Sequence, residues 1–173
     1  MAKKRKSKKN QTTLLVLFVA ILLSVLTICT LFMPMLKTAS DSFGGASLTG
    51  AEIIEVAFAD DGDGMTLQQM SMLYTKKSDD GFSTGVYCWA YFVSLIAAAA
   101  VLVFAVLKIV GIKLDLIGVI AGAALVVLSL VVFIFGFIAC GKFAVEWIAT
   151  IGAYFAFFGG LLGGAAAVYG AKK

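Results

Sequence analysis

Four long apolar stretches dominate the chain and alternate with shorter polar stretches. Uncharged apolar runs occupy residues 14–36, 86–107, 116–140 and 148–170. A helix needs about 20 apolar residues to cross the hydrocarbon core of a bilayer, and each run reaches that length. Because the runs are apolar on every face, they do not fit the alternating strands of a transmembrane barrel. The pattern predicts an all-α integral membrane protein.

The polar stretches predict how the four helices are arranged. Short connections make the second, third and fourth helices antiparallel neighbours. We therefore expect an antiparallel four-helix transmembrane bundle with a small extracellular segment between its first two helices. The expected segments are a cytoplasmic N-terminus (1–13), the first span (14–36), an extracellular segment (37–84), the second span (85–108), a cytoplasmic loop (109–115), the third span (116–140), an extracellular loop (141–147), the fourth span (148–170) and a cytoplasmic C-terminus (171–173).

Composition and charge agree with this class and predict an orientation. The chain is 61% hydrophobic and 14% charged, with a mean hydropathy of +1.02, whereas soluble domains are about 45–50% apolar and about 25% charged. Ten of the 14 basic residues fall at the two termini, in the 109–115 loop and at Lys108 just before it, whereas nine of the ten acidic residues fall in the other two loops. Basic residues stay on the cytoplasmic side, so we expect a multi-pass cell-membrane protein with both termini in the cytoplasm.

The basic N-terminus admits two other interpretations. A nucleic-acid patch is disfavoured because the basic run lies directly beside a membrane span, and no nucleic-acid partner is expected. A cleaved signal peptide is disfavoured by length, because the first apolar run has 23 residues and a signal core has about 7–15. We expect a retained anchor.

The extracellular segment carries two helix signals after a Gly/Ser/Asp-rich loop at residues 40–47. Thr49 and Glu52 have capping-box spacing, which predicts a helix over 51–58, although alternating apolar residues there also fit a strand. Thr66 and Gln69 repeat the spacing and predict a helix over 66–75. We expect this segment to fold over the bundle with five apolar residues turned toward it: Ile53, Phe58, Leu67, Met70 and Tyr74. Ala57 is expected to be buried beside Ile53 and Phe58, and Leu73 shares the helical spacing of the second helix.

An acidic turn separates the two predicted helices. Asp60, Asp61 and Asp63 lie among glycines, and part of this pattern matches a calcium-binding loop. The first and twelfth positions of such a loop would be Ala59 and Met70, so the bidentate glutamate is missing. The remaining interpretations are a solvated turn and a contact surface for a partner, and we expect no metal site.

The residue inventory excludes several chemistries. The chain has no histidine, and its three cysteines lack the spacing of a zinc knuckle. We therefore predict a protein that is not an enzyme, with no catalytic residues and no cofactor. Cys29, Cys88 and Cys140 either pack as free thiols or form one disulfide. None of the spans carries an Asp, Glu, Lys or Arg in its interior, which argues against a proton-coupled carrier.

Small residues recur in the third and fourth spans at the spacing that lets helices pack closely. Rows of this kind allow two backbones to approach each other, so we predict helix contacts along them. A second row, Gly159 and Gly163, runs beside the main one. The main predicted packing positions are Gly118, Gly122, Gly152, Ala156, Gly160 and Gly164.

The topology resembles that of the claudin-like and other tetraspan proteins, which have four spans, internal termini, a long first outer loop and a short second one. The likeness is one of architecture, because residues 37–84 contain neither the Trp nor the paired Cys of the claudin loop. The lysine-rich start and compact size are also similar to small four-span membrane proteins of bacteria. We expect an accessory or interaction protein that presents its extracellular segment to a membrane or surface protein partner or to lipid. The alternative is a small transport component that acts as a homo-oligomer.

Overall fold

The computed structural model describes residues 2–38, 47–79, 81–141 and 147–173, and for residues 2–10, 38 and 147 it describes the backbone alone. Its elements follow the order α1 (Ala2–Cys29), η1 (Thr30–Phe32), β1 (Pro34–Thr38), β2 (Ser47–Thr49), α2 (Gly50–Phe58), α3 (Leu67–Lys77), α4 (Phe82–Ile109), α5 (Asp115–Cys140), β3 (Trp147–Ala149) and α6 (Ile151–Ala171).

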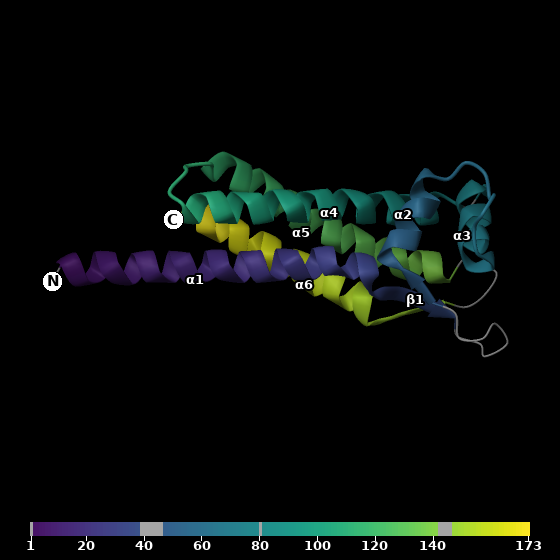
Figure 1. Ribbon diagram of the computed structural model, residues 1–173, viewed down its shortest axis with the longest axis horizontal. Helices are drawn as coiled ribbons and strands as arrows, with labels where there is room; N and C mark the ends of the chain where they lie inside the picture. The colour runs from purple at the N-terminus through teal and green to yellow at the C-terminus, as the bar shows by residue number, and fades with distance from the viewer. Residues whose placement is uncertain (1, 39–46, 80, 142–146) are drawn as a thin grey trace.

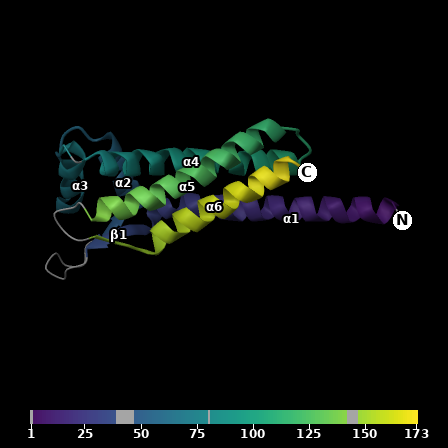
Figure 2. The same cartoon turned by 180° about the vertical axis from the view of Figure 1, so that it is seen from behind.

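Four helices form an antiparallel bundle, as the sequence predicts. Among the described residues, the helical segments Gln11–Phe32, Phe82–Ile109, Asp115–Cys140 and Ile151–Ala171 are long and apolar enough to cross a membrane. They pack in the ring order α1, α4, α5, α6. Both termini lie at one end of the bundle, where α1 projects past the other helices (Figure 1). Figure 2 shows the same bundle from behind, with α5 and α6 crossing α1 and α4 at an angle. The chain is thus a polytopic membrane protein.

Two predicted spans extend beyond an end of the helix that forms. The first was expected to continue to residue 36, but the helix ends at Phe32 and Pro34–Thr38 is strand β1. Proline lacks a backbone N–H and disfavours helical backbone in the residue before it, and Met33 is accordingly extended (ψ 147°). The fourth span was expected from residue 148, but Trp147–Ala149 pairs as strand β3 and helix α6 begins at Ile151.

A three-stranded sheet, which the sequence does not predict, joins the ends of the spans. The strand order is β2-β1-β3, and both pairings are antiparallel. Strand β1 continues from η1 and pairs with β3, which leads into α6, so Leu36 lies opposite Ala149. Beyond the sheet, the amide of Thr150 donates to the Met35 carbonyl at 3.0 Å, and its hydroxyl donates to the Pro34 carbonyl. The sheet therefore ties α1 to α6.

The two capping-box predictions are confirmed. In α2 the Thr49 hydroxyl accepts from the Glu52 amide, and the Glu52 carboxylate accepts from the Thr49 amide. In α3 the same reciprocal pair forms between Thr66 and Gln69. These bonds satisfy donors that a helix start otherwise leaves unpaired. We call α2, α3 and strands β1 to β3 together the cap. The predicted loop at 40–47 lies almost entirely outside the described residues.

The cap and the bundle share a continuous apolar core. One cluster of buried residues includes Leu48, Ile53 and Met72 of the cap together with Tyr87 and Tyr91 of α4. A second cluster, around Leu17, Val101, Leu125 and Ala167, fills the bundle toward the end with both termini. The cap is therefore packed onto the bundle rather than tethered to it.

The sequence predicts correctly some of the α2 residues that face the bundle. For α3, most of the residues predicted to face the bundle do not. Ile53 and Ala57 are buried, but Phe58 is 54% exposed and lies edge-on to Trp89 and Phe92 of α4. In α3 the buried residues are Gln69, Met72 and Leu73.

Leu67 and Tyr74 of α3 are exposed, and Met70 is half-buried. The physical reason is that Gln69, a polar residue, is held on the inner face by hydrogen bonds, and this sets which side of α3 faces the bundle.

Candidate functional site

Polar side chains lock α2 and α3 of the cap together. The Gln69 Nε2 group donates to the Glu55 carboxylate at 2.6 Å, while the Gln69 Oε1 atom accepts from the Thr66 amide at 2.8 Å. The Lys76 ammonium donates to the carbonyls of Val56 and Ala57, at 3.0 and 2.7 Å. A cation at the last carbonyls of a helix offsets the negative end of its dipole. The cap thus has a defined shape.

The acidic turn lies between α2 and α3 on the surface of the cap. Asp60, Asp61 and Asp63 are all exposed. A Cβ atom placed on Gly62 would lie 3.4 Å from the Met70 methyl group, so the turn folds back against α3. Within the part of the chain that the structure describes, no three His, Cys, Asp or Glu side chains are grouped to hold a metal ion.

The outer face of α3 exposes two large apolar side chains. Leu67 is 73% exposed and Tyr74 is 68% exposed. They are seven residues apart, which is about two helical turns, so they lie on the same face of α3. Figure 1 shows α3 at the far end of the molecule, beyond the end of the bundle and across its long axis. We call Leu67, Tyr74 and the acidic turn Asp60–Asp63 the α3 surface.

The predicted packing positions all lie at buried points in the bundle. Gly122 and Gly164 bring α5 and α6 together, since a Cβ on Gly164 would lie 2.5 Å from the Gly122 carbonyl oxygen. A Cβ on Gly160 would clash with the Ser129 hydroxyl of α5, and one on Gly118 would clash with the Phe104 ring of α4.

The remaining positions of the fourth span have different neighbours. A Cβ on Gly152 would lie 2.5 Å from the Pro34 carbonyl oxygen of β1, and Ala156 is 4% exposed. The second small row faces another helix, because a Cβ on Gly159 would lie 2.7 Å from the Thr27 hydroxyl of α1, and one on Gly163 would lie 3.1 Å from Leu23. The main row of small residues in α6 thus faces α5 and β1, and the second row faces α1.

Several hydroxyls inside the spans are bound within the bundle. Thr27, Ser94 and Ser129 donate to carbonyls three or four residues earlier in their own helices, at 2.7–2.9 Å. The hydroxyls of Thr30 and Tyr91 bond each other at 2.9 Å and join α4 to η1. The Thr30–Tyr91 bond therefore links two elements, whereas the other three hydroxyls are bonded within their own helices. All three cysteines are free thiols.

Comparisons of the chain with protein-family models, with curated proteins and with solved structures return no match. The functional argument therefore rests on the geometry of the cap and the bundle.

Sequence reasoning missed Lys76 and misplaced Leu67 and Tyr74. Nothing in the local sequence marks Lys76 as a partner for carbonyls about 20 positions earlier. The capping box places the Gln69 side chain beside the start of α3, but it does not by itself say which side of the helix faces the bundle. Together with its bond to Glu55, this places Gln69 toward α2 and Leu67 away from it.

Proposed function

We propose that this chain is a non-enzymatic, multi-pass protein of the cell membrane that binds a partner protein through the α3 surface. The observation that carries the proposal is the pair of exposed apolar side chains, Leu67 and Tyr74, on a helix whose inner face is already packed. A grouped apolar surface beside polar residues, away from the spans, is typical of a protein interaction site.

The partner is expected to carry positive charge. Residues 37–84 contain eight acidic and three basic residues. Lys76, one of the three basic residues, is already bonded to the α2 carbonyls, whereas the three aspartates of the acidic turn are exposed. Complementary charge steers two surfaces together, and apolar contacts at the centre supply affinity. The complex should weaken as salt increases, because exposed charges are screened beyond about 8 Å at physiological ionic strength.

The orientation that suits this function places the cap outside the cell. Ten basic residues belong to the end of the molecule with both termini, and four belong to the end with the cap. By the positive-inside rule the termini are cytoplasmic. In a cysteine-free background, a cysteine at Ser78 should react with an impermeant thiol reagent in intact cells, and one at Ser7 should react only after permeabilisation. The reverse pattern would contradict this orientation.

The structure of the bundle favours an interaction role over a transport role. The four helices meet through close glycine contacts such as Gly122 to Gly164, and hydroxyls such as Ser129 bond their own helix. Rigid packing of this kind suits a platform that holds the cap in place.

Site-specific photocrosslinking in native membranes tests the proposed function. A photoreactive residue at Leu67 or Tyr74 should give one discrete protein adduct, and the same residue at the exposed Lys37 of β1 should give none. Replacing Asp60, Asp61 and Asp63 with Asn should reduce the adduct, as should high salt. Equal adducts from all three positions, or lipid adducts only, would overturn the proposal.

A further inference from the structure

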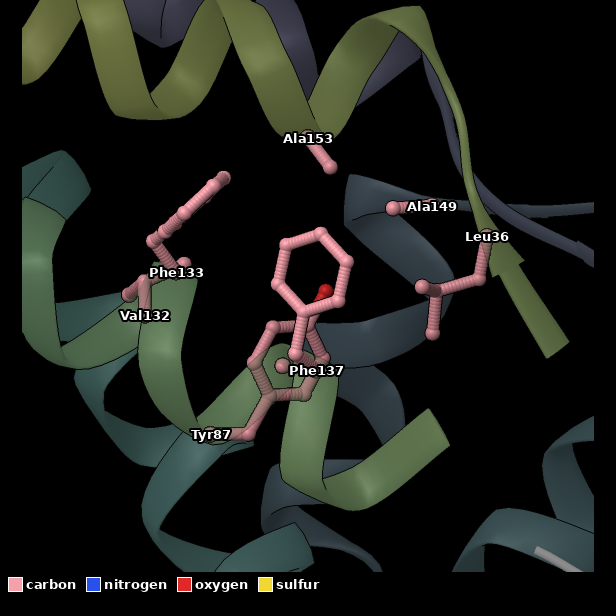
Figure 3. Close-up of a pocket in the computed structure, with 8 residues that line it drawn as sticks. Leu36, Tyr87, Val132, Phe133, Phe137, Ala149 and Ala153 are labelled. Atoms are coloured by element: carbon pink, nitrogen blue, oxygen red, sulfur yellow. The ribbon is translucent and has the colours of Figure 1, made fainter. Parts of the chain in front are cut away.

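A small crevice opens between α5, α6 and the sheet, on the side of the bundle. It has a volume of about 20 Å³. Figure 3 shows the Phe133 and Phe137 side chains from α5, Ala153 from α6, and Leu36 and Ala149 from the sheet around it. The lining residues are Leu36, Tyr87, Val132, Phe133, Gly136, Phe137, Ala149 and Ala153.

The crevice is closed at its floor and open at its rim. Leu36 and Tyr87 are each 2% exposed, whereas Phe137 is 49% exposed. Since α5 and α6 are membrane-spanning helices, a rim that opens beside them faces the bilayer. A Cβ on Gly136 would lie 2.9 Å from the Tyr87 ring, so glycine at this position makes room for the ring on the floor.

The floor of the crevice carries a single polar group, the Tyr87 hydroxyl. Figure 3 shows its oxygen directed past the Phe137 ring toward Leu36 and Ala149. This hydroxyl has no hydrogen-bond partner among the described residues. Tyr91 lies one helical turn further along α4 and differs from Tyr87, because the Tyr91 hydroxyl is bonded to the Thr30 hydroxyl at 2.9 Å. A buried hydroxyl without a partner is unfavourable, so Tyr87 is suited to donate to an acceptor that enters the crevice.

The lining discriminates between possible acceptors. The volume suits one oxygen-sized group. A buried water needs two to four polar partners, but the other side chains around the crevice are apolar. The backbone around the crevice belongs to regular secondary structure, because Leu36 and Ala149 are partners in the sheet and Gly136 lies within helix α5. An acceptor oxygen carried on an apolar molecule therefore fits better than water.

The position of Tyr87 along α4, relative to the bilayer, indicates which molecule supplies such an acceptor oxygen. Helix α4 has 28 residues, which is about 42 Å at 1.5 Å per residue. A bilayer measures about 30 Å across its hydrocarbon core and about 40–45 Å with its headgroups. Tyr87 is five residues past Phe82 at the start of α4, about 7.5 Å along the axis. This is the boundary between headgroups and hydrocarbon, where the ester groups of phospholipids lie.

We propose that this crevice binds a membrane phospholipid. The Tyr87 hydroxyl donates to an ester carbonyl of the lipid, and one acyl chain lies against Phe133 and Phe137. The site is independent of the partner bound by the cap and of which side of the membrane the cap faces.

Melting temperature in two matched lipids tests the proposal. The purified protein is reconstituted with diester phosphatidylcholine or with the diether analogue of the same chain length, which lacks the carbonyl. For the wild-type protein, the diester lipid should give a melting temperature ~2–4 °C higher, as expected for about one hydrogen bond in a chain of this size. In Tyr87→Phe, which keeps the ring, this difference should vanish.

Two further variants make the result specific. Tyr91→Phe should lower the melting temperature in both lipids and keep the difference between them, because its hydroxyl bonds Thr30 rather than lipid. Ala153→Leu should fill the crevice and abolish the difference while leaving the Tyr87 hydroxyl in place. Equal melting temperatures of the wild type in the two lipids, or a difference that persists in Tyr87→Phe, would overturn the proposal.

Discussion

The bundle and the cap are stabilised in opposite ways, although they share one core. In the bundle, small residues bring backbones together, as at Gly122 and Gly164. In the cap, side-chain hydrogen bonds fix short elements, as at Thr66, Gln69 and Lys76. A membrane-spanning helix is apolar on all sides, so the shape of its surface determines which helix packs against it. A helix of the cap is positioned instead by hydrogen bonds between polar side chains. Substitutions should therefore act through volume in the bundle and through lost hydrogen bonds in the cap.

The largest effect is expected where two backbones touch. Gly164→Leu would place a side chain at the point where even a Cβ atom would lie 2.5 Å from the Gly122 oxygen. Overpacking of this kind typically costs about 1–3 kcal/mol and sometimes more, and we expect ~3 kcal/mol or more of unfolding free energy. Thermal unfolding in detergent measures it. Ala165→Leu, at an exposed neighbouring position, is the matched control and should have little effect. An equal loss in both variants would mean that α5 and α6 are not in contact at Gly164.

The next largest effect is expected at Lys76. Lys76→Met would keep the apolar stem but leave the Val56 and Ala57 carbonyls without their charged donor. Hydrogen bonds to charged groups contribute about 1.5–3 kcal/mol. Hydrogen exchange at the α2 amides should accelerate by ~10-fold or more, while exchange in the spans stays unchanged. Lys77→Met, at an exposed position, is the control. Unchanged exchange in α2 would contradict this role of Lys76.

A smaller effect is expected at the capping box of α3. Thr66→Ala would remove the hydroxyl that accepts from the Gln69 amide at 3.3 Å. Losing such a cap costs about 1 kcal/mol. Faster hydrogen exchange confined to the first turn of α3 would show it, and Thr66→Ser should restore protection. Loss of protection throughout the four spans would instead show that α3 supports the bundle.

The smallest effect on stability is expected at the acidic turn. Asp60→Asn, Asp61→Asn and Asp63→Asn together remove three exposed charges. Surface substitutions of this kind usually change the unfolding free energy by less than about 0.5 kcal/mol. Melting temperature should stay nearly constant while partner binding weakens. A large rise in the wild-type melting temperature on adding calcium would replace the contact role with a metal site.

The sequence allows the bundle to be predicted better than the cap, for a physical reason. A span is recognised from its own apolar residues, so all four helices could be placed. The ends of a span are harder to predict from sequence. Pro34, for example, begins a strand whose partner residues in β3 lie more than 100 positions later in the chain. Strands of three residues such as Ser47–Thr49 and Trp147–Ala149 carry too little pattern to be recognised locally.

Within the candidate site, exposure of the acidic turn could be predicted, but the rotation of α3 could not. Hydrophobic periodicity assigned Leu67 and Tyr74 to the inner face, whereas hydrogen bonding turned Gln69 inward. The lining of the Tyr87 crevice comes from three helices and two paired strands, so no local pattern marks it. Sites built across distant segments require the fold before they become visible.

The pairing of β1 with β3 also sets an order in time. Strand β1 leaves the ribosome early, but its partner at residues 147–149 follows only after the third span has been made. Chains are synthesised from the N-terminus, and pairings between distant segments form late. The cap therefore reaches its final form only after residues 147–149, in the last fifth of the chain, have been translated. A chain truncated before residue 147 would leave the β3 side of strand β1 without its partner.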